Sequence, residues 1–147
     1  QVTSSLGVLD LELMEIAPLE NLRGSYAAAP SHYKPYDFAE HIYKKALKKS
    51  ARYGGSKVPR IVLLVYVTDW AFVLSDSVVC LLQYWLQSRP HNFEQVYAHQ
   101  PVEPGFGFTH LLYPTPAAHW QSFNPETLKN NVVQNLSPLK WETAREG

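Results

Sequence analysis

The feature that most constrains this sequence is the run RIVLLVYVTD at residues 60–69, which is apolar at nearly every position. Its β-branched residues favour an extended strand over a helix. A strand that is apolar on both faces is typical of the middle of a sheet whose two faces are both covered. The sequence therefore predicts that residues 60–69 form a central strand.

A helix is predicted between this strand and the N-terminal part of the chain. Asp37 is a good N-cap residue, Glu40 completes a capping-box pattern, and Gly54 and Gly55 end the helix. Apolar residues at helical spacing predict its buried stripe: Phe38, Ala39, Ile42, Tyr43, Ala46, Leu47 and Ala51.

Five further elements follow from periodicity and turn residues. Residues 7–17 alternate as a strand, residues 77–88 form a second helix, and residues 93–99 and 108–114 form two short strands. Asn124 opens a last short helix. The order is strand, helix, strand, helix, strand, strand, helix. This order predicts an α/β or α+β fold with a mixed central sheet flanked by helices.

Length and composition indicate one globular domain over residues 1–147, with a core at 7–114 and a C-terminal extension at 115–147. The single cysteine, Cys80, excludes an internal disulfide and favours a cytoplasmic location. No apolar run approaches the roughly 20 residues that span a bilayer, so no membrane partner is expected. The chain begins at Gln1 rather than Met, which leaves open whether the natural N-terminus extends further.

Three carboxylates interrupt the apolar run LDLELMEIAP near the start of the chain. The two-residue period of a strand places Asp10 and Glu12 on one face and Glu15 on the other. A β-bulge would be needed to bring all three together. Acids in an edge strand also keep it soluble and hinder pairing with other edges, which is the alternative interpretation.

The first predicted helix and its C-terminal flank hold six of the thirteen basic residues: Lys44, Lys45, Lys48, Lys49, Arg52 and Lys57. Side chains one turn apart stack into a dense positive face. An acidic strand followed by a basic helix suits a site in which carboxylates hold Mg²⁺ and lysines contact a nucleic-acid backbone. A solvated helix face is the alternative interpretation of the same lysines.

The order of elements resembles that of the PD-(D/E)XK nuclease superfamily, also called the restriction-endonuclease-like fold. The matching pieces lie within residues 7–114: LDLELMEIAP, HIYKKALKKSARYGG, RIVLLVYVTD, SVVCLLQYWLQS and FEQVYAH. In that family, acids at the sheet centre bind Mg²⁺ and a lysine helps to activate the attacking water.

The resemblance implies that Asp10 and Glu15 hold Mg²⁺, with Glu12 as an alternate ligand. It also implies a catalytic lysine recruited from the helix, Lys44, with Lys45 and Lys48 as the alternatives. It further implies that the remaining cations contact phosphate: Lys45, Lys48, Lys49, Arg52 and Lys57. The family's own lysine, two places after an acid, is missing. Ala17 follows Glu15 and Met14 follows Glu12 at that spacing.

Two functions follow from these observations. The first is a divergent metal-dependent nuclease-like protein that acts on nucleic acid or, without catalysis, only binds it. The second is a small non-enzymatic protein-interaction module, homodimeric, with no cofactor and no nucleic-acid role. The missing lysine favours the second.

Two smaller expectations concern aromatic and histidine side chains. His99 and His110 lie on two predicted neighbouring strands and could meet across them. The C-terminal extension carries Trp120 but has weak periodicity, so its aromatic residues are expected to bury a subunit interface.

Overall fold

The structure, a computed structural model, describes residues 2–4, 7–16, 32–54, 60–68 and 73–134. These residues form a mixed sheet with strand order β1-β2-β4-β5-β6 and two α-helices, which confirms the predicted α/β class. The main elements are β1 (Val2–Ser4), β2 (Gly7–Ile16), α1 (Pro35–Ser50), β4 (Ile61–Val67), α2 (Asp76–Ser88), β5 (Gln95–Glu103) and β6 (Phe106–Tyr113). The shorter ones are β3 (His32–Tyr33), η2 (Ala51–Tyr53), η3 (Ala117–Trp120), η4 (Pro125–Leu128) and β7 (Val133–Gln134).

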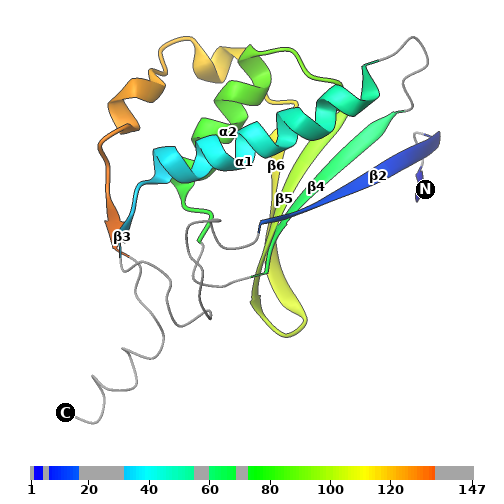
Figure 1. Ribbon diagram of the computed structural model, residues 1–147, viewed down its shortest axis with the longest axis horizontal. Helices are drawn as coiled ribbons and strands as arrows, with labels where there is room; N and C mark the ends of the chain where they lie inside the picture. Colours follow the sequence, from blue (N-terminus) through cyan, green and yellow to red (C-terminus); the bar gives the residue numbers. More distant parts are fainter. Residues whose placement is uncertain (1, 5–6, 17–31, 55–59, 69–72, 135–147) are drawn as a thin grey trace.

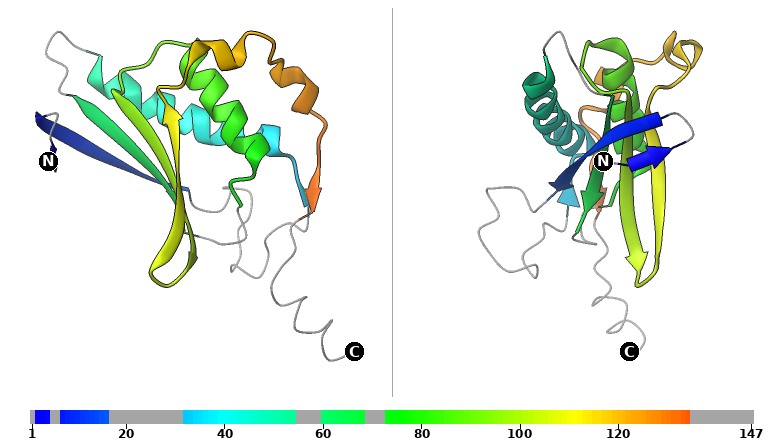
Figure 2. Two further views of the ribbon diagram at one scale, coloured as in Figure 1. Left: turned by 180° about the vertical axis from the view of Figure 1, so that it is seen from behind. Right: turned by 90° about the vertical axis from the view of Figure 1, so that its right-hand side faces the viewer.

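The path of the chain places both helices on one face of the sheet. Strands β2, β4 and β5 are parallel, and α1 and α2 connect them in turn, while β6 returns antiparallel to β5. Because both crossovers advance in the same direction and such crossovers are right-handed, their helices lie on the same side. Figures 1 and 2 show α1 and α2 packed together over the sheet.

The hydrophobic core lies between this sheet face and the two helices. Alternate residues of β4 face it, and Leu63 is completely buried. Met14 and Ile16 of β2 enter the same core. The helices contribute these side chains, among others: Phe38, Ile42, Tyr43, Val78, Leu81, Leu82 and Trp85. The predicted central position of residues 60–69 is therefore confirmed, except that Asp69 lies outside the described residues.

The opposite face of the sheet is covered by neither helix. Leu64 and Tyr66 of β4 are half-buried there, and Leu11, Leu13 and Leu111 are 42%, 51% and 42% exposed. The prediction that both faces of the central strand are covered is therefore wrong for the described residues. The cause is the topology, since the strand order never reverses and so sends no helix to the second face.

The ends of the predicted helices differ in detail. α1 starts at Pro35 after Lys34 as N-cap, so the capping box predicted at Asp37 is not formed, and Asp37 lies in the first turn. Proline is well suited to this first position because its missing N–H has no partner there anyway. The last predicted helix is only the single turn η4, although Asn124 does cap it by accepting a hydrogen bond from the Glu126 N–H.

The first part of the C-terminal extension packs on α2. The Trp120 ring lies 6.2 Å from Tyr84 and 5.4 Å from Phe123, measured between ring centroids. These contacts hold the half-buried Trp120 against its own chain, and the expected subunit interface of the C-terminal aromatic residues stays a prediction.

The β5–β6 hairpin turns at Pro104 and Gly105, and Gly105 has a positive φ of 80°. Across the hairpin His99 pairs with Thr109, whereas His110 pairs with Ala98. Neighbouring residues of a strand point to opposite faces, so the expected meeting of His99 and His110 is wrong. His99 Nδ1 instead lies 2.8 Å from Thr109 Oγ1.

In the described part of the chain, neither helix combines the length and the apolar character needed to cross a bilayer.

Candidate binding groove between β2 and α1

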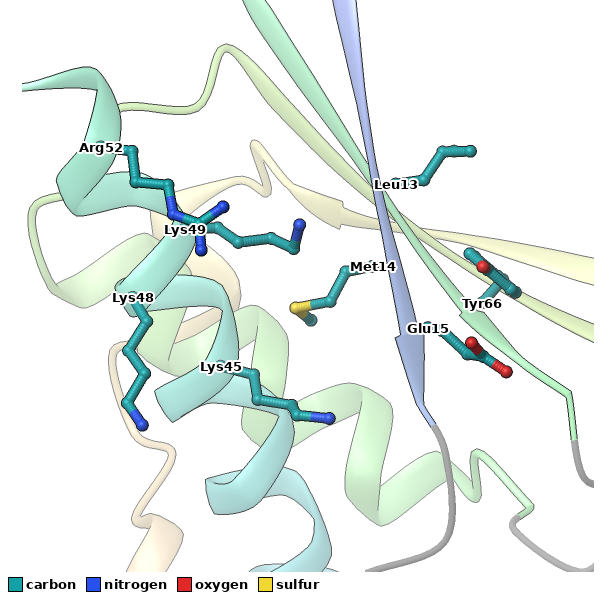
Figure 3. A pocket seen from close by; sticks show the side chains of 8 residues that line it. All are labelled: Leu13, Met14, Glu15, Lys45, Lys48, Lys49, Arg52 and Tyr66. Atoms are coloured by element: carbon teal, nitrogen blue, oxygen red, sulfur yellow. The ribbon is translucent and has the colours of Figure 1, made fainter.

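A hollow of about 390 Å³ lies between β2 and the C-terminal half of α1. This volume falls within the roughly 300–1,000 Å³ typical of ligand sites. We call it the β2–α1 groove, and eight residues line it: Leu13, Met14, Glu15, Lys45, Lys48, Lys49, Arg52 and Tyr66. Figure 3 shows Lys45 and Lys49 extending from the helix toward β2.

The groove straddles the plane of the sheet. Met14 faces the helices, whereas Leu13 and Glu15 project from the other face of the same strand. Tyr66 pairs with Glu15 across β2 and β4 and so lies on that second face too. The hollow therefore wraps around the outer edge of β2 and does not lie over only one face.

The outer edge of β2 has no strand partner over most of its length in the described residues. β1 pairs only with Gly7–Leu9, and β4 pairs with the inner edge from Asp10 to Ile16. The Asp10 N–H donates to the Arg60 carbonyl beside β4, at 2.9 Å. Backbone groups alternate in direction along a strand, so those of Leu11, Leu13 and Glu15 point away from β4.

Glu12 is held by two side chains, one from the end of α1 and one from the turn η2 that follows it. Lys49 Nζ donates to Glu12 Oε1, and the Tyr53 hydroxyl donates to Glu12 Oε2 at 2.7 Å. The hydrogen bond from Lys49, followed by that from Tyr53, lowers the pKa of the Glu12 carboxyl below its ordinary value. The hydrogen bond between Tyr53 and Glu12 also raises the pKa of the Tyr53 hydroxyl. Glu12 thus joins strand to helix with its charge already balanced.

The predicted Mg²⁺ ligands are not brought together. The pairing of β2 with β4 runs without a bulge from Asp10 to Ile16, so Asp10 and Glu15 lie on opposite faces. Glu15 accepts a hydrogen bond from the Thr68 hydroxyl at 3.0 Å. Within the described ranges no three His, Cys, Asp or Glu residues are grouped as metal ligands would be. The donor set on β2 therefore does not fit a magnesium site.

The predicted basic residues separate into three groups. Lys44 pairs with Glu40 at 3.1 Å and does not line the groove, which leaves the proposed catalytic lysine away from it. Lys49 pairs with Glu12, and Lys57 lies outside the described residues. Three cations of the groove form no ion pair with the described residues: Lys45, Lys48 and Arg52.

The acids and cations were predicted from the sequence, but the tyrosines and the open strand edge beside them were not. Tyr53 and Tyr66 were not predicted as part of any site, and no local signal marks them. The free edge of β2 was considered only as a general property of acidic strands. It follows from the sheet order, which no short segment of the sequence encodes.

Comparison with known proteins adds no relative: no protein-family model matches the chain, and neither a curated protein nor a solved structure is detectably similar to it. The resemblance to PD-(D/E)XK nucleases and the restriction-endonuclease-like fold accordingly stay predictions.

Proposed function

We propose that this chain is a non-enzymatic protein-interaction module whose binding site is the β2–α1 groove. The observation that supports it is a strand edge beside three cations, none of which has a strand or ion-pair partner among the described residues. An open edge offers backbone donors and acceptors to a partner chain, and flanking charges select among partners.

The arrangement of the acids favours binding over catalysis. Metal-assisted hydrolysis needs at least two carboxylates converging on one ion. On β2, Glu12 is engaged by Lys49 and Tyr53, while Asp10 and Glu15 point to opposite faces. The nuclease hypothesis would require these groups to rearrange.

The proposal is tested by selecting displayed random peptides on the immobilised protein and measuring the affinity of each enriched peptide by fluorescence anisotropy. Peptides bound in the groove are expected to lose about tenfold in affinity with Lys45→Glu. Lys44→Glu is the matched control, because the neighbouring lysine undergoes the same charge change outside the groove. Circular dichroism and thermal melts of both variants check that the fold is intact.

The absence of any peptide that depends on Lys45 would contradict the proposal. So would cleavage of plasmid or single-stranded DNA with Mg²⁺ or Mn²⁺ that is lost in both Asp10→Ala and Glu15→Ala. That result would establish the nuclease hypothesis instead.

A homodimer is a second candidate, and it rests on the helix-free face of the sheet, which shares Leu13 with the groove. Leu11, Leu13 and Leu111 are exposed on the helix-free face of the sheet. Apolar side chains on a sheet face suit the centre of a subunit interface. Sedimentation equilibrium is expected to show a dimer that Leu111→Lys converts to monomer, and a wild-type monomer at all concentrations would remove this candidate.

A further inference from the structure

We propose that the occupant of the β2–α1 groove is an extended segment of another protein, with acidic and apolar residues in alternation, which adds to the sheet as a strand beside β2. This inference rests on the proposed function and specifies the partner of the same site.

The outer edge of β2 presents backbone groups to which a further strand can pair. The outer edge of β2 from Asp10 to Ile16, which no described strand pairs with, measures about 23 Å at roughly 3.3 Å per residue. Along it, the N–H and C=O groups of Leu11, Leu13 and Glu15 point outward, away from β4. A strand added there would give these groups the main-chain partners that an interior strand has.

The α1 side of the groove carries an excess of positive charge. On its α1 side, Lys45, Lys48 and Arg52 form no ion pair with the described residues, and the charge of Lys49 is balanced by Glu12. Among the described residues Glu15 is the one carboxylate that lines the groove, and it projects on the other side of the sheet. Side chains of an added strand that face α1 would therefore meet an excess of positive charge, which acidic residues match.

The other side of the groove selects apolar residues. Leu13 is 51% exposed and Tyr66 is half-buried, and both lie on the helix-free face (Figure 3). Because side chains alternate between the two faces of a strand, every second residue of the partner would pack there. Acidic and apolar residues in alternation are the pattern that satisfies both sides.

A second copy of β2 fits this edge less well. Antiparallel pairing of two β2 edges keeps both α1 helices on the same face of the joined sheet. Their unpaired cations would then face each other across the junction, and Asp10 and Glu15 of the two copies would lie along adjacent strands. Like charges placed opposite each other are destabilising.

Nucleic acid also fits less well. Affinity for its phosphate backbone depends on how many phosphates the lysine and arginine side chains neutralise. The groove offers three unpaired cations among the described residues, and a phosphate backbone would leave the edge of β2 unused.

The test uses an acetylated and amidated peptide in which glutamate alternates with valine, measured by fluorescence anisotropy. A peptide of the same composition without the alternation is its control. Binding of the alternating peptide is expected to weaken about tenfold with Lys45→Glu and with Arg52→Glu, but less than about twofold with Lys44→Glu.

Backbone methylation tests strand addition separately from charge. N-methyl groups on all valines remove one set of N–H donors, and N-methyl groups on all glutamates remove the other. Only one set faces β2: that of valine if the added strand is antiparallel, and that of glutamate if it is parallel. One methylated peptide is therefore expected to lose binding while the other keeps it. Equal behaviour of the two would overturn the inference.

Other outcomes distinguish a failure of this inference from a failure of the proposed function on which it rests. If the alternating peptide fails to bind while unrelated peptides from the display selection depend on Lys45, the partner class is wrong and the proposed function stands. If no peptide depends on Lys45, both fall. Tighter binding of an oligothymidylate, or a dimer abolished by Lys45→Glu, would instead identify nucleic acid or a second copy as the occupant.

Discussion

The Tyr53 hydroxyl donates a hydrogen bond of 2.7 Å to Glu12, 41 residues earlier in the chain. With the bond from Lys49 to the other carboxylate oxygen, it ties the end of α1 and the turn η2 to β2. One of the three acids of β2 is therefore a structural group that holds one wall of the groove in place.

Removing this carboxylate charge is expected to lower stability at neutral pH. Glu12→Gln should cost about 1 kcal/mol, because the cluster is partly exposed and its charges are screened by solvent. Chemical denaturation at pH 7 measures this change. A double-mutant cycle with Tyr53→Phe should show coupling between the two sites, since each substitution removes the same hydrogen bond.

The pH dependence gives an independent check on Glu12. Its folded pKa is lowered from the ordinary 4.5, so its stabilisation is present above 4.5 and is lost as pH falls toward the folded value. The stability difference between wild type and Glu12→Gln should therefore shrink in that window. A difference that stays constant down to pH 3 would contradict the described cluster.

His91 is expected to make the protein less stable in mild acid. Its Nε2 donates to the Leu86 carbonyl at 3.0 Å and its Nδ1 accepts from the Phe93 N–H, so the neutral ring satisfies both nitrogens. Burial lowers the pKa of His91 below 6.5. Stability present above pH 6.5 should fall as pH drops toward the lowered pKa. In urea denaturation between pH 7 and 5, the free energy of unfolding of His91→Gln should fall less with decreasing pH than that of the wild type. The same fall in both proteins would refute this prediction.

Gly107 is expected to be sensitive to the smallest substitution. A Cβ there would lie 2.7 Å from the Gln100 carbonyl oxygen and 2.7 Å from the His99 ring. Because a backbone atom cannot easily move aside, Gly107→Ala should cost about 1–3 kcal/mol. Gly54→Ala is the control, since its nearest contacts are at 3.7 Å and its φ is negative. Thermal melts that rank the two variants equally would contradict the hairpin geometry.

Neighbouring leucines of β4 should respond differently to truncation. Leu63 is fully buried against the helices, so Leu63→Ala should cost about 2–5 kcal/mol. Leu64 is half-buried on the helix-free face, and Leu64→Ala should cost less than about 1.5 kcal/mol in the monomer. Urea denaturation of both variants at low protein concentration tests this order. A larger loss for Leu64 would mean that the second face is covered.

The order of the main elements could be predicted, as could the face of the sheet to which each side chain of β2 points, because both follow from local patterns. The two-residue period correctly placed Glu12 with Met14 and Glu15 opposite them, as the register with β4 confirms. The start of α1 was predicted three residues late, with Asp37 as N-cap in place of Lys34, because Pro35 in the first turn outweighs the capping pattern at Asp37. The strand at residues 7–17 ends at Ile16 among the described residues.

The charges could be counted from the sequence, but their pairing could not. Lys44 and Lys45 are neighbours of the same kind, yet one pairs with Glu40 and the other lines the groove. This difference depends on the rotation of α1 relative to β2, which packing of the buried stripe decides. Tyr53 became a partner of Glu12 for the same reason.

By itself the sequence determined the main strands β2, β4, β5 and β6, the helices α1 and α2, and which side chains of β2 share a face, since hydrophobic periodicity acts over a few residues. Only the tertiary structure decided three properties of the described residues: most of the outer edge of β2 has no strand partner, the acids of β2 do not converge, and three cations without an ion-pair partner flank that edge. Those properties depend on strand order and helix placement, which arise from contacts between residues far apart in the chain.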